Sequence, residues 1–443
     1  MPRFEEFPNP TPTLDQIGFS AAELAALAGD RQLLFSLPSR DITVLARGES
    51  RFYKSAVFRG SAMVLPVSAD RVRQHLRDYA AYAEYIPNTE SVAVQAVHGV
   101  HARVEYRHVF RLSMMTVGTR LILQHTHEAD GSLSAMLVEG DADAAVSRWQ
   151  LVALDAQRTL VVYLNWADIA SINLLINMLL KAQPDMAVAA PYGAAFVGME
   201  ALRRAFMPDE AKPAELKHLP TLPVVPPFPE VAQHPLLTSL VAAGPVAFVD
   251  SGQWLNRDGE VYCQRFVAVG AVVDTELEQA FQHSLRFDSY TEFFPLVQKA
   301  VCRPRQEGFA VDWLVGIGLG FFSLGVRYRL AYRQSGPAGL HFHQEEGDLA
   351  HIDGEWRWQA LSAHQSLGAL TISNHIGESA PLVLRFARQF PYHDILAGLY
   401  MGLTGMPRMS RWVSCQDVPV LARGLSLPTP ELAKSVRQSR RLQ

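Results

Sequence analysis

The chain has 443 residues, of which 49% are hydrophobic and 19% are charged, and its formal net charge is −4. This composition excludes a disordered chain, and the charge excludes the basic surface typical of nucleic-acid binding. The three cysteines, Cys263, Cys302 and Cys415, form no Cys-x-x-Cys pair, which excludes a zinc clip and a redox motif of that type. The length allows two or three globular domains.

The start of the chain shows no basic segment followed by an apolar one, so we expect no secretory signal. The most apolar run, residues 169–180, covers about 12 residues, whereas a membrane-spanning helix needs roughly 20. We therefore expect a cytoplasmic protein.

In chain order, residues 1–48 form an N-terminal arm with a short helix and a strand. Ser20 followed by Glu23 has the spacing of a capping box, which predicts a helix beginning there. A strand-like stretch, residues 42–45, follows. We assign residues 49–207 to a first domain that opens with a strand over 56–65 and continues with a helix from Ser68.

Antiparallel strands are predicted next, near residues 103–112, 117–127, 132–139, 145–154 and 158–167. The first of them alternates charged and apolar side chains, as expected of a strand with one solvated and one buried face. Helical sequence over 171–206 closes the domain, and Pro184 and Pro191 predict two helices rather than one.

Many prolines over 208–234 predict an extended linker without regular structure. A second domain is assigned to 235–415 and a tail to 416–443. The second domain repeats signals of the first in the same order, which indicates a duplication. The paired segments are 82–87 with 290–295, 117–123 with 324–330, 139–141 with 346–348, 148–150 with 357–359, Asn165 with Asn374, 191–192 with 391–392, and 33–37 with 236–240.

This element order predicts an α+β fold of two tandem helix-grip domains, each a curved antiparallel sheet wrapped around a C-terminal helix. Over about 55–207 and 260–413 the halves resemble the START-like superfamily of polyketide cyclases and lipid carriers. The box Tyr82-x-Glu84-Tyr85-Ile86-Pro87 is similar to an element of its coenzyme Q-binding branch. The resemblance implies a pocket on the concave side of each sheet.

Candidate ligand-binding residues are those on the apolar side of their strands, where a polar or aromatic group would face such a pocket. A structural role in the core is the alternative for each, and no catalytic residue is assigned. The candidates are Tyr106, His108, His125, Trp149, Tyr163 and Asn165 in the first half, and Trp313, Tyr328, Tyr332, Trp358 and Asn374 in the second.

Other polar residues are expected outside the pockets. Arg120 and Arg327 fall on the opposite side of their strands, which predicts outer-face positions, and Glu139 is either a rim group or an anchor at the mouth. His108 corresponds to Val315 in the repeat, so we expect unequal pockets.

Neither a metal nor a cofactor is predicted. The pairs His125-x-His127 and His341-x-His343 have no carboxylate or cysteine at a motif distance. A Gly-x-Gly-x-Gly run over 316–320 lies within a predicted strand and not before a helix, so we do not expect a phosphate-binding loop. Glycines in a strand are expected to relieve sheet curvature or to admit a close neighbour.

Three functions are compatible with these residues. The first is a binding or carrier protein for a hydrophobic small molecule such as a lipid, quinone, isoprenoid or polyketide. The second is a di-domain polyketide aromatase/cyclase or dehydratase, but no paired acid and base supports it, so we favour a non-enzyme. The third is an interaction module with filled pockets, whose helix over 169–182 contacts a membrane surface or a partner.

Overall fold

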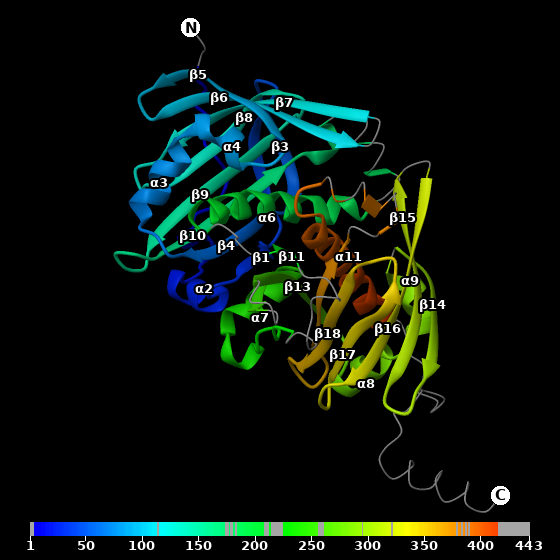
Figure 1. The fold of residues 1–443 in the computed structure, drawn as a ribbon. Coiled ribbons are helices and arrows are strands. Elements are labelled where there is room, and N and C mark those ends of the chain that lie inside the picture. The colour runs from blue at the N-terminus through cyan, green and yellow to red at the C-terminus, as the bar shows by residue number, and fades with distance from the viewer. Residues whose placement is uncertain are drawn as a thin grey trace, which may run out of the picture.

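The computed structural model describes the chain with short gaps. The described residues are 4–112, 115–172, 177, 180–181, 184–207, 212–213, 225–255, 261–294, 296–319, 322–377, 380–381, 384–385, 388 and 390–414. They form two halves, each with a curved antiparallel sheet and a C-terminal helix against its concave face (Figure 1). The predicted α+β helix-grip architecture is confirmed.

The first half contains the following elements: α1 (Leu14–Ile17), α2 (Ala21–Ala28), β1 (Gln32–Ser36), β2 (Arg40–Ala46), β3 (Glu49–Ala56), β4 (Arg59–Leu65), α3 (Ala69–Arg77), η1 (Tyr79–Ala81), α4 (Tyr82–Tyr85), β5 (Thr89–His98), β6 (His101–Leu112), β7 (Met115–His127), β8 (Leu133–Gly140), β9 (Ala145–Ala153), β10 (Thr159–Ala167), η2 (Ile169–Ser171) and α6 (Met186–Phe206). The Ser20 side chain caps α2 by accepting from the Glu23 amide, as its position predicted.

The second half follows the same order after residue 230: η4 (Val231–Gln233), α7 (Pro235–Ala243), β12 (Val246–Leu255), β13 (Val261–Val273), α8 (Leu277–Ser284), η5 (Phe287–Ser289), α9 (Tyr290–Phe293), β14 (Val297–Pro304), β15 (Phe309–Leu319), β16 (Phe322–Gln334), β17 (Gly339–Gly347), β18 (His351–Ala360), β19 (Ser366–His375) and α11 (His393–Ser414). The five strands predicted for the first meander, and their repeats in the second half, are present with small differences at their ends.

The two sheets are joined edge to edge. Within the first half, β4 pairs with β1 and β10, and within the second, β13 pairs with β12 and β19. Antiparallel pairing of β1 with β12, with Leu33 opposite Phe248, then makes one continuous sheet. Residues assigned to the N-terminal arm therefore form the strand that connects the halves.

One predicted correspondence is wrong. Residues 33–37 were matched with 236–240, but the first segment lies in β1 and the second in α7. The equivalent elements are α2 with α7 and β1 with β12, while the β2–β3 hairpin has its own two-stranded sheet. The two segments have similar apolar residues, but one is a strand and the other a helix. Pro235, which suits the first position of a helix, favours the helix in the second segment.

Equivalent contacts support the duplication. The Tyr82 hydroxyl donates to the Leu76 carbonyl at 2.7 Å, and the Tyr290 hydroxyl donates to the Ser284 carbonyl at 2.7 Å. Gly140 and Gly347 have φ values of 149° and 147° in matching turns. In each turn a Cβ would collide with the neighbouring strand, so glycine is required there.

The two prolines of the closing segment have different outcomes, and the linker needs a correction. α6 begins after Pro184, where a break was expected, and it continues through Pro191, because its buried side chains Tyr192 and Phe196 hold it against the core. The linker was predicted to lack regular structure, yet Lys212–Pro213 form the short strand β11 beside β13. A buried phenylalanine, Phe228, also anchors the linker to the second half.

The two closing helices meet at the junction of the halves. Phe196 of α6 packs edge-on against Tyr392, just before α11, with ring centroids 5.5 Å apart. Glu200 of α6 is fully buried and pairs with Arg203 of its own helix and Arg265 of β13, each at 2.9 Å. The carboxylate thus links the closing helix of one half to the sheet of the other.

Within the described parts of the chain, no helix combines the length and the apolar character needed to cross a bilayer.

Candidate functional site

A polar pair lies on the concave face of the first sheet, which we call the first cup. The Tyr106 hydroxyl and His125 Nε2 are hydrogen-bonded at 2.8 Å between β6 and β7. His108 stacks parallel to Tyr106 with ring centroids 6.2 Å apart, and its Nδ1 lies 3.2 Å from the Thr89 hydroxyl. These three sequence-predicted residues therefore come together.

Burial keeps this pair uncharged. It lowers the pKa of His125 to about 3, with a smaller contribution from His127, and it raises the pKa of Tyr106 well above its usual value. Desolvation also lowers the pKa of His108. His125 Nδ1 is buried and has no hydrogen-bond partner among the described residues. The first cup therefore contains a neutral imidazole with one ring nitrogen unused.

An aromatic stack and an amide form the neighbouring part of the first cup. The centroids of the stacked Trp149 and Tyr163 rings are 4.2 Å apart, and Gly198 of α6 lies against both rings. Asn165, two residues along β10, has a buried Nδ2 without a partner in the described parts of the chain. Because an unpaired buried amide is unfavourable, this group is available to a ligand or a water molecule.

The corresponding concave face of the second half, the second cup, is filled by its own aromatic side chains. Trp313 packs against Phe287 and Tyr290, with ring centroids 6.3 and 5.3 Å away. Tyr332 lies 4.7 Å from Phe287. Trp358 stacks on Trp356 at 6.5 Å. Three predicted ligand-binding residues of this half are thus core residues in this structure.

The remaining two candidates, Tyr328 and Asn374, have different surroundings. Tyr328 packs against a small apolar cluster that includes Ile376 and Leu384, and burial raises its pKa. Asn374 donates its amide to the Asp394 carbonyl at 3.1 Å. Unlike Asn165, this amide already has a partner within the chain.

The two cups differ in exposure. His108, Leu123 and Trp149 of the first cup are half-buried. Their counterparts Val315, Leu330 and Trp358 are 7%, 4% and 3% exposed. The expected difference between the halves is therefore present in their packing.

Two hollows are found in the first half. One of ≈10 Å³, room for about one water molecule, lies beside Trp149 and is otherwise lined by Arg73, Leu76, Arg77, His127, Gly131, Leu133 and Leu151. A larger one of ≈390 Å³ lies between the N-terminal arm and the outer face of the sheet, where Glu5 and Asn9 face Gln124 and Arg148. Sequence analysis did not predict the second, because it depends on where the arm crosses the sheet.

Residues expected outside the cups are outside them. Arg120 forms ion pairs with Glu105 at 3.1 Å and Glu139 at 2.8 Å on the outer face. Glu139 is 53% exposed, which fits a rim group. Half of the predicted contact helix over 169–182 lies outside the described residues, so its role stays a prediction.

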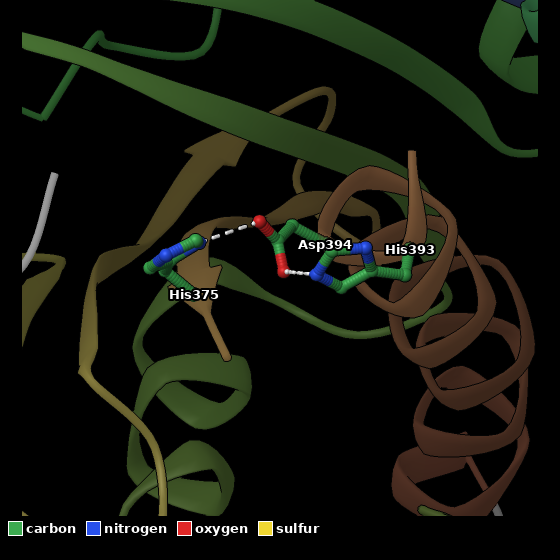
Figure 2. Close-up of side chains that lie close together, drawn as sticks. All are labelled: His375, His393 and Asp394. Carbon is green, nitrogen blue, oxygen red and sulfur yellow. Dashed lines mark hydrogen bonds and ion pairs between the residues drawn. The ribbon is translucent and has the colours of Figure 1, made fainter. Parts of the chain in front are cut away.

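A cluster that sequence analysis missed lies where β19 ends and α11 begins (Figure 2). His375 Nδ1 is 2.9 Å from one carboxylate oxygen of Asp394, and His393 Nε2 is 2.7 Å from the other. Burial opposes ionisation of Asp394, but the two imidazoles outweigh it and lower its pKa to about 2. The adjacent pair His393-Asp394 was the available signal, but 17 residues of intervening chain hide its proximity to His375.

Comparison with known proteins places part of this architecture in context. Residues 273–395 match the family model described as polyketide cyclase / dehydrase and lipid transport. The second half is similar to that family. This agrees with the broader resemblance seen in the sequence, while the link to the coenzyme Q-binding branch stays a prediction. No curated protein matches the chain.

Several solved structures are similar to parts of the chain. The di-domain ARO/CYC StfQ from the steffimycin biosynthetic pathway is 10% identical, with 80% of this chain and 98% of that chain covered and a TM-score of 0.26. A Thermus thermophilus protein is 13% identical, covering 34% of this chain and 99% of its own, with a TM-score of 0.29. A START superfamily protein from Mycobacterium smegmatis is 15% identical, with 34% of this chain and 96% of that chain covered and a TM-score of 0.27. At such values the fold assignment depends on the strand order of the chain itself.

Proposed function

We propose that the protein binds and carries a hydrophobic small molecule, a lipid, quinone, isoprenoid or polyketide, and that the first cup is its binding site. The observation that carries this proposal concerns two buried groups, His125 Nδ1 and Asn165 Nδ2, which have no hydrogen-bond partner in the described parts of the chain and lie among half-buried aromatic and apolar side chains. Leaving each unsatisfied is unfavourable by about 1–3 kcal/mol, which a ligand with matching polar atoms would recover.

The chemistry of the first cup limits the ligand. The Asn165 amide is a donor, so the ligand needs an acceptor such as a carbonyl or hydroxyl oxygen. The Trp149–Tyr163 stack offers an aromatic surface to a flat or apolar body. Burial of roughly 300 Å² of apolar ligand surface is worth about 7 kcal/mol before ordering is counted, enough for binding without covalent chemistry.

Entry requires movement of side chains, because the hollow beside Trp149 has room for about one water molecule. The half-buried residues of the first cup can move more easily than the tightly packed aromatics of the second. We therefore assign the second half the role of a scaffold and the first half the role of the carrier.

Catalysis by an aromatase/cyclase or dehydratase is the alternative, and the family matched by residues 273–395 is its support. In the first cup, however, burial keeps Tyr106 protonated and His125 neutral across the physiological range, since their pKa values lie far from 7. Proton transfer at neutral pH works best when the pKa of the acid or base is close to the working pH. This favours carriage.

Native mass spectrometry of freshly purified protein, followed by extraction of any bound compound, tests the proposal. The fluorescent dye 1-anilinonaphthalene-8-sulfonate, which has an apolar aromatic body and an anionic sulfonate, serves as the probe of the first cup. We expect Leu123→Trp, which fills the cup, to abolish the bound mass and to weaken dye binding at least about 10-fold, the effect of losing about 1.4 kcal/mol.

Val97→Trp is the matched control, because it adds the same ring at a 69% exposed position of β5. Equal dye binding by both variants would contradict the assignment of the first cup. Turnover of a model polyketide, lost in His108→Ala, would instead establish the enzyme alternative. Flotation with phosphatidylcholine vesicles tests the predicted membrane contact through 169–182.

A further inference from the structure

The cluster of His375, His393 and Asp394 has an unusual arrangement of acceptors. One ligand atom from each residue lies within 4.8 Å of the others, and the carboxylate stands between the two imidazoles (Figure 2). The side chains of His375, His393 and Asp394 are 9%, 18% and 26% exposed, so the cluster is neither sealed nor on an open surface.

The tautomer of His393 follows from its backbone neighbour. Its Nδ1 lies 3.2 Å from the Phe390 carbonyl oxygen, which can only accept, so Nδ1 carries the hydrogen. In the neutral ring Nε2 then presents a lone pair. This lone pair lies 2.7 Å from Asp394 Oδ1, which is also an acceptor.

Two acceptors at this distance repel each other unless a positive charge lies beside both. A proton on Nε2 supplies this charge in the metal-free chain, where His393 and Asp394 form an ion pair. A divalent metal ion beside both atoms would supply the charge in place of that proton.

We propose that His375, His393 and Asp394 bind a divalent first-row transition-metal ion. Two imidazole nitrogens and one carboxylate oxygen are a donor set that suits Zn²⁺ or Fe²⁺. Three protein ligands leave at least one coordination position for water or another small ligand. This inference is independent of the carrier role of the first cup.

Surrounding contacts hold the ligands in place. The Nδ1 hydrogen of His393 directed at the Phe390 carbonyl orients that ring, as second partners of metal-bound histidines commonly do. The Asn374 amide holds the Asp394 main chain through its carbonyl. A strand end and the first turn of a 22-residue helix thus supply the site from two rigid elements.

The first half has no equivalent of this site. Pairing Asn165 with Asn374 and 191–192 with 391–392 puts Trp166 opposite His375, and Gly193 and Ala194 opposite His393 and Asp394. None of these three residues has a metal-binding side chain. The expected stoichiometry is therefore one ion per chain and not two.

Equilibrium dialysis of full-length, chelator-treated protein against Zn²⁺ tests the proposal, with bound metal measured by mass spectrometry. We expect one Zn²⁺ per chain. Asp394→Asn and His393→Ala should each weaken Zn²⁺ binding by about 100-fold or more. This loss exceeds the roughly 10–100-fold seen when a residue that only orients a metal ligand is removed. His375→Gln is a third variant in case another fails to fold, as judged by circular dichroism.

His341→Ala is the matched control, because it removes a histidine from the other pair in the second half and should leave Zn²⁺ binding unchanged. Substitution with Co²⁺ should give visible absorption bands that are lost in Asp394→Asn. Absence of bound Zn²⁺, or equal binding by the Asp394→Asn and His341→Ala variants, would overturn the proposal.

Discussion

The two cups have the same strands and opposite interiors. In the first, a buried neutral histidine–tyrosine pair, and an amide without a partner among the described residues, lie beside the half-buried His108, Leu123 and Trp149. In the second, Trp313, Tyr332 and Trp358 are 6%, 2% and 3% exposed within an aromatic cluster. Under the proposed carrier function, one copy of a duplicated helix-grip domain fills its own concavity and serves as a support, while the other copy binds the ligand.

The strongest test of this difference uses two tryptophans at equivalent positions. Trp358 is buried against Trp356 and Gly368, so Trp358→Ala should destabilise the fold by about 3–5 kcal/mol through the cavity it leaves. Trp149 is half-buried and stacks mainly on Tyr163, so Trp149→Ala should be less destabilising, about 2 kcal/mol. Urea unfolding measures both, and equal losses would contradict unequal packing.

A second test uses a buried carboxyl that only the second half has. Burial raises the pKa of Asp353 from 3.8 to about 6, although a hydrogen bond from Gln264 opposes the shift, and Ala144 takes its place in the first half. Between pH 3.8 and about 6 the folded chain keeps a proton that the unfolded chain has lost. The free energy of unfolding should therefore fall by about 3 kcal/mol as pH rises through this window.

Unfolding of wild-type protein and Asp353→Asn at a series of pH values measures this effect. Because other groups titrate in both proteins, the difference between the two curves isolates Asp353. A difference that stays constant from pH 4 to 6 would show that Asp353 is not held protonated.

The smallest expected effect concerns a device that both halves share. Gln150 accepts from the Leu14 amide at 2.8 Å, and its repeat Gln359 accepts from the Val231 amide at 2.9 Å and donates to the Pro229 carbonyl. Gln150→Ala and Gln359→Ala should each destabilise by about 1 kcal/mol.

Hydrogen exchange at the Leu14 and Val231 amides measures this locally, since each amide should lose protection only in its own variant. The exposed Gln157 offers a control substitution to alanine. Loss of protection at both amides in either variant would show that the two segments are coupled.

Prediction from sequence worked best where a pattern is local. The alternation in residues 103–112 correctly identified β6 and its two faces, because successive side chains of a strand point to opposite sides. The placement of Tyr106 with His125, and of Arg120 outside, followed from the same alternation. It could not reveal that Phe287 and Trp356 would close the second cup, since packing depends on side chains that are distant in sequence.

The errors have similar causes. Residues 33–37 and 236–240 have similar apolar sequences, but the first segment lies in strand β1 and the second in helix α7, according to what each packs against. Pro191 was expected to break or kink the closing segment, and buried Tyr192 and Phe196 keep α6 continuous through it. In each case tertiary packing outweighed a local preference of a few kcal/mol.

The sequence by itself determined the duplication, the series of strands and the class of fold. These features depend on hydrophobic periodicity and on repeated turn residues, which are local properties of the chain. Only the tertiary structure decided which cup is packed more tightly, how β1 and β12 join the halves, and that His375 meets His393 and Asp394. These features arise from contacts between segments that are far apart in the chain, and burial and distance exist only once the chain has folded.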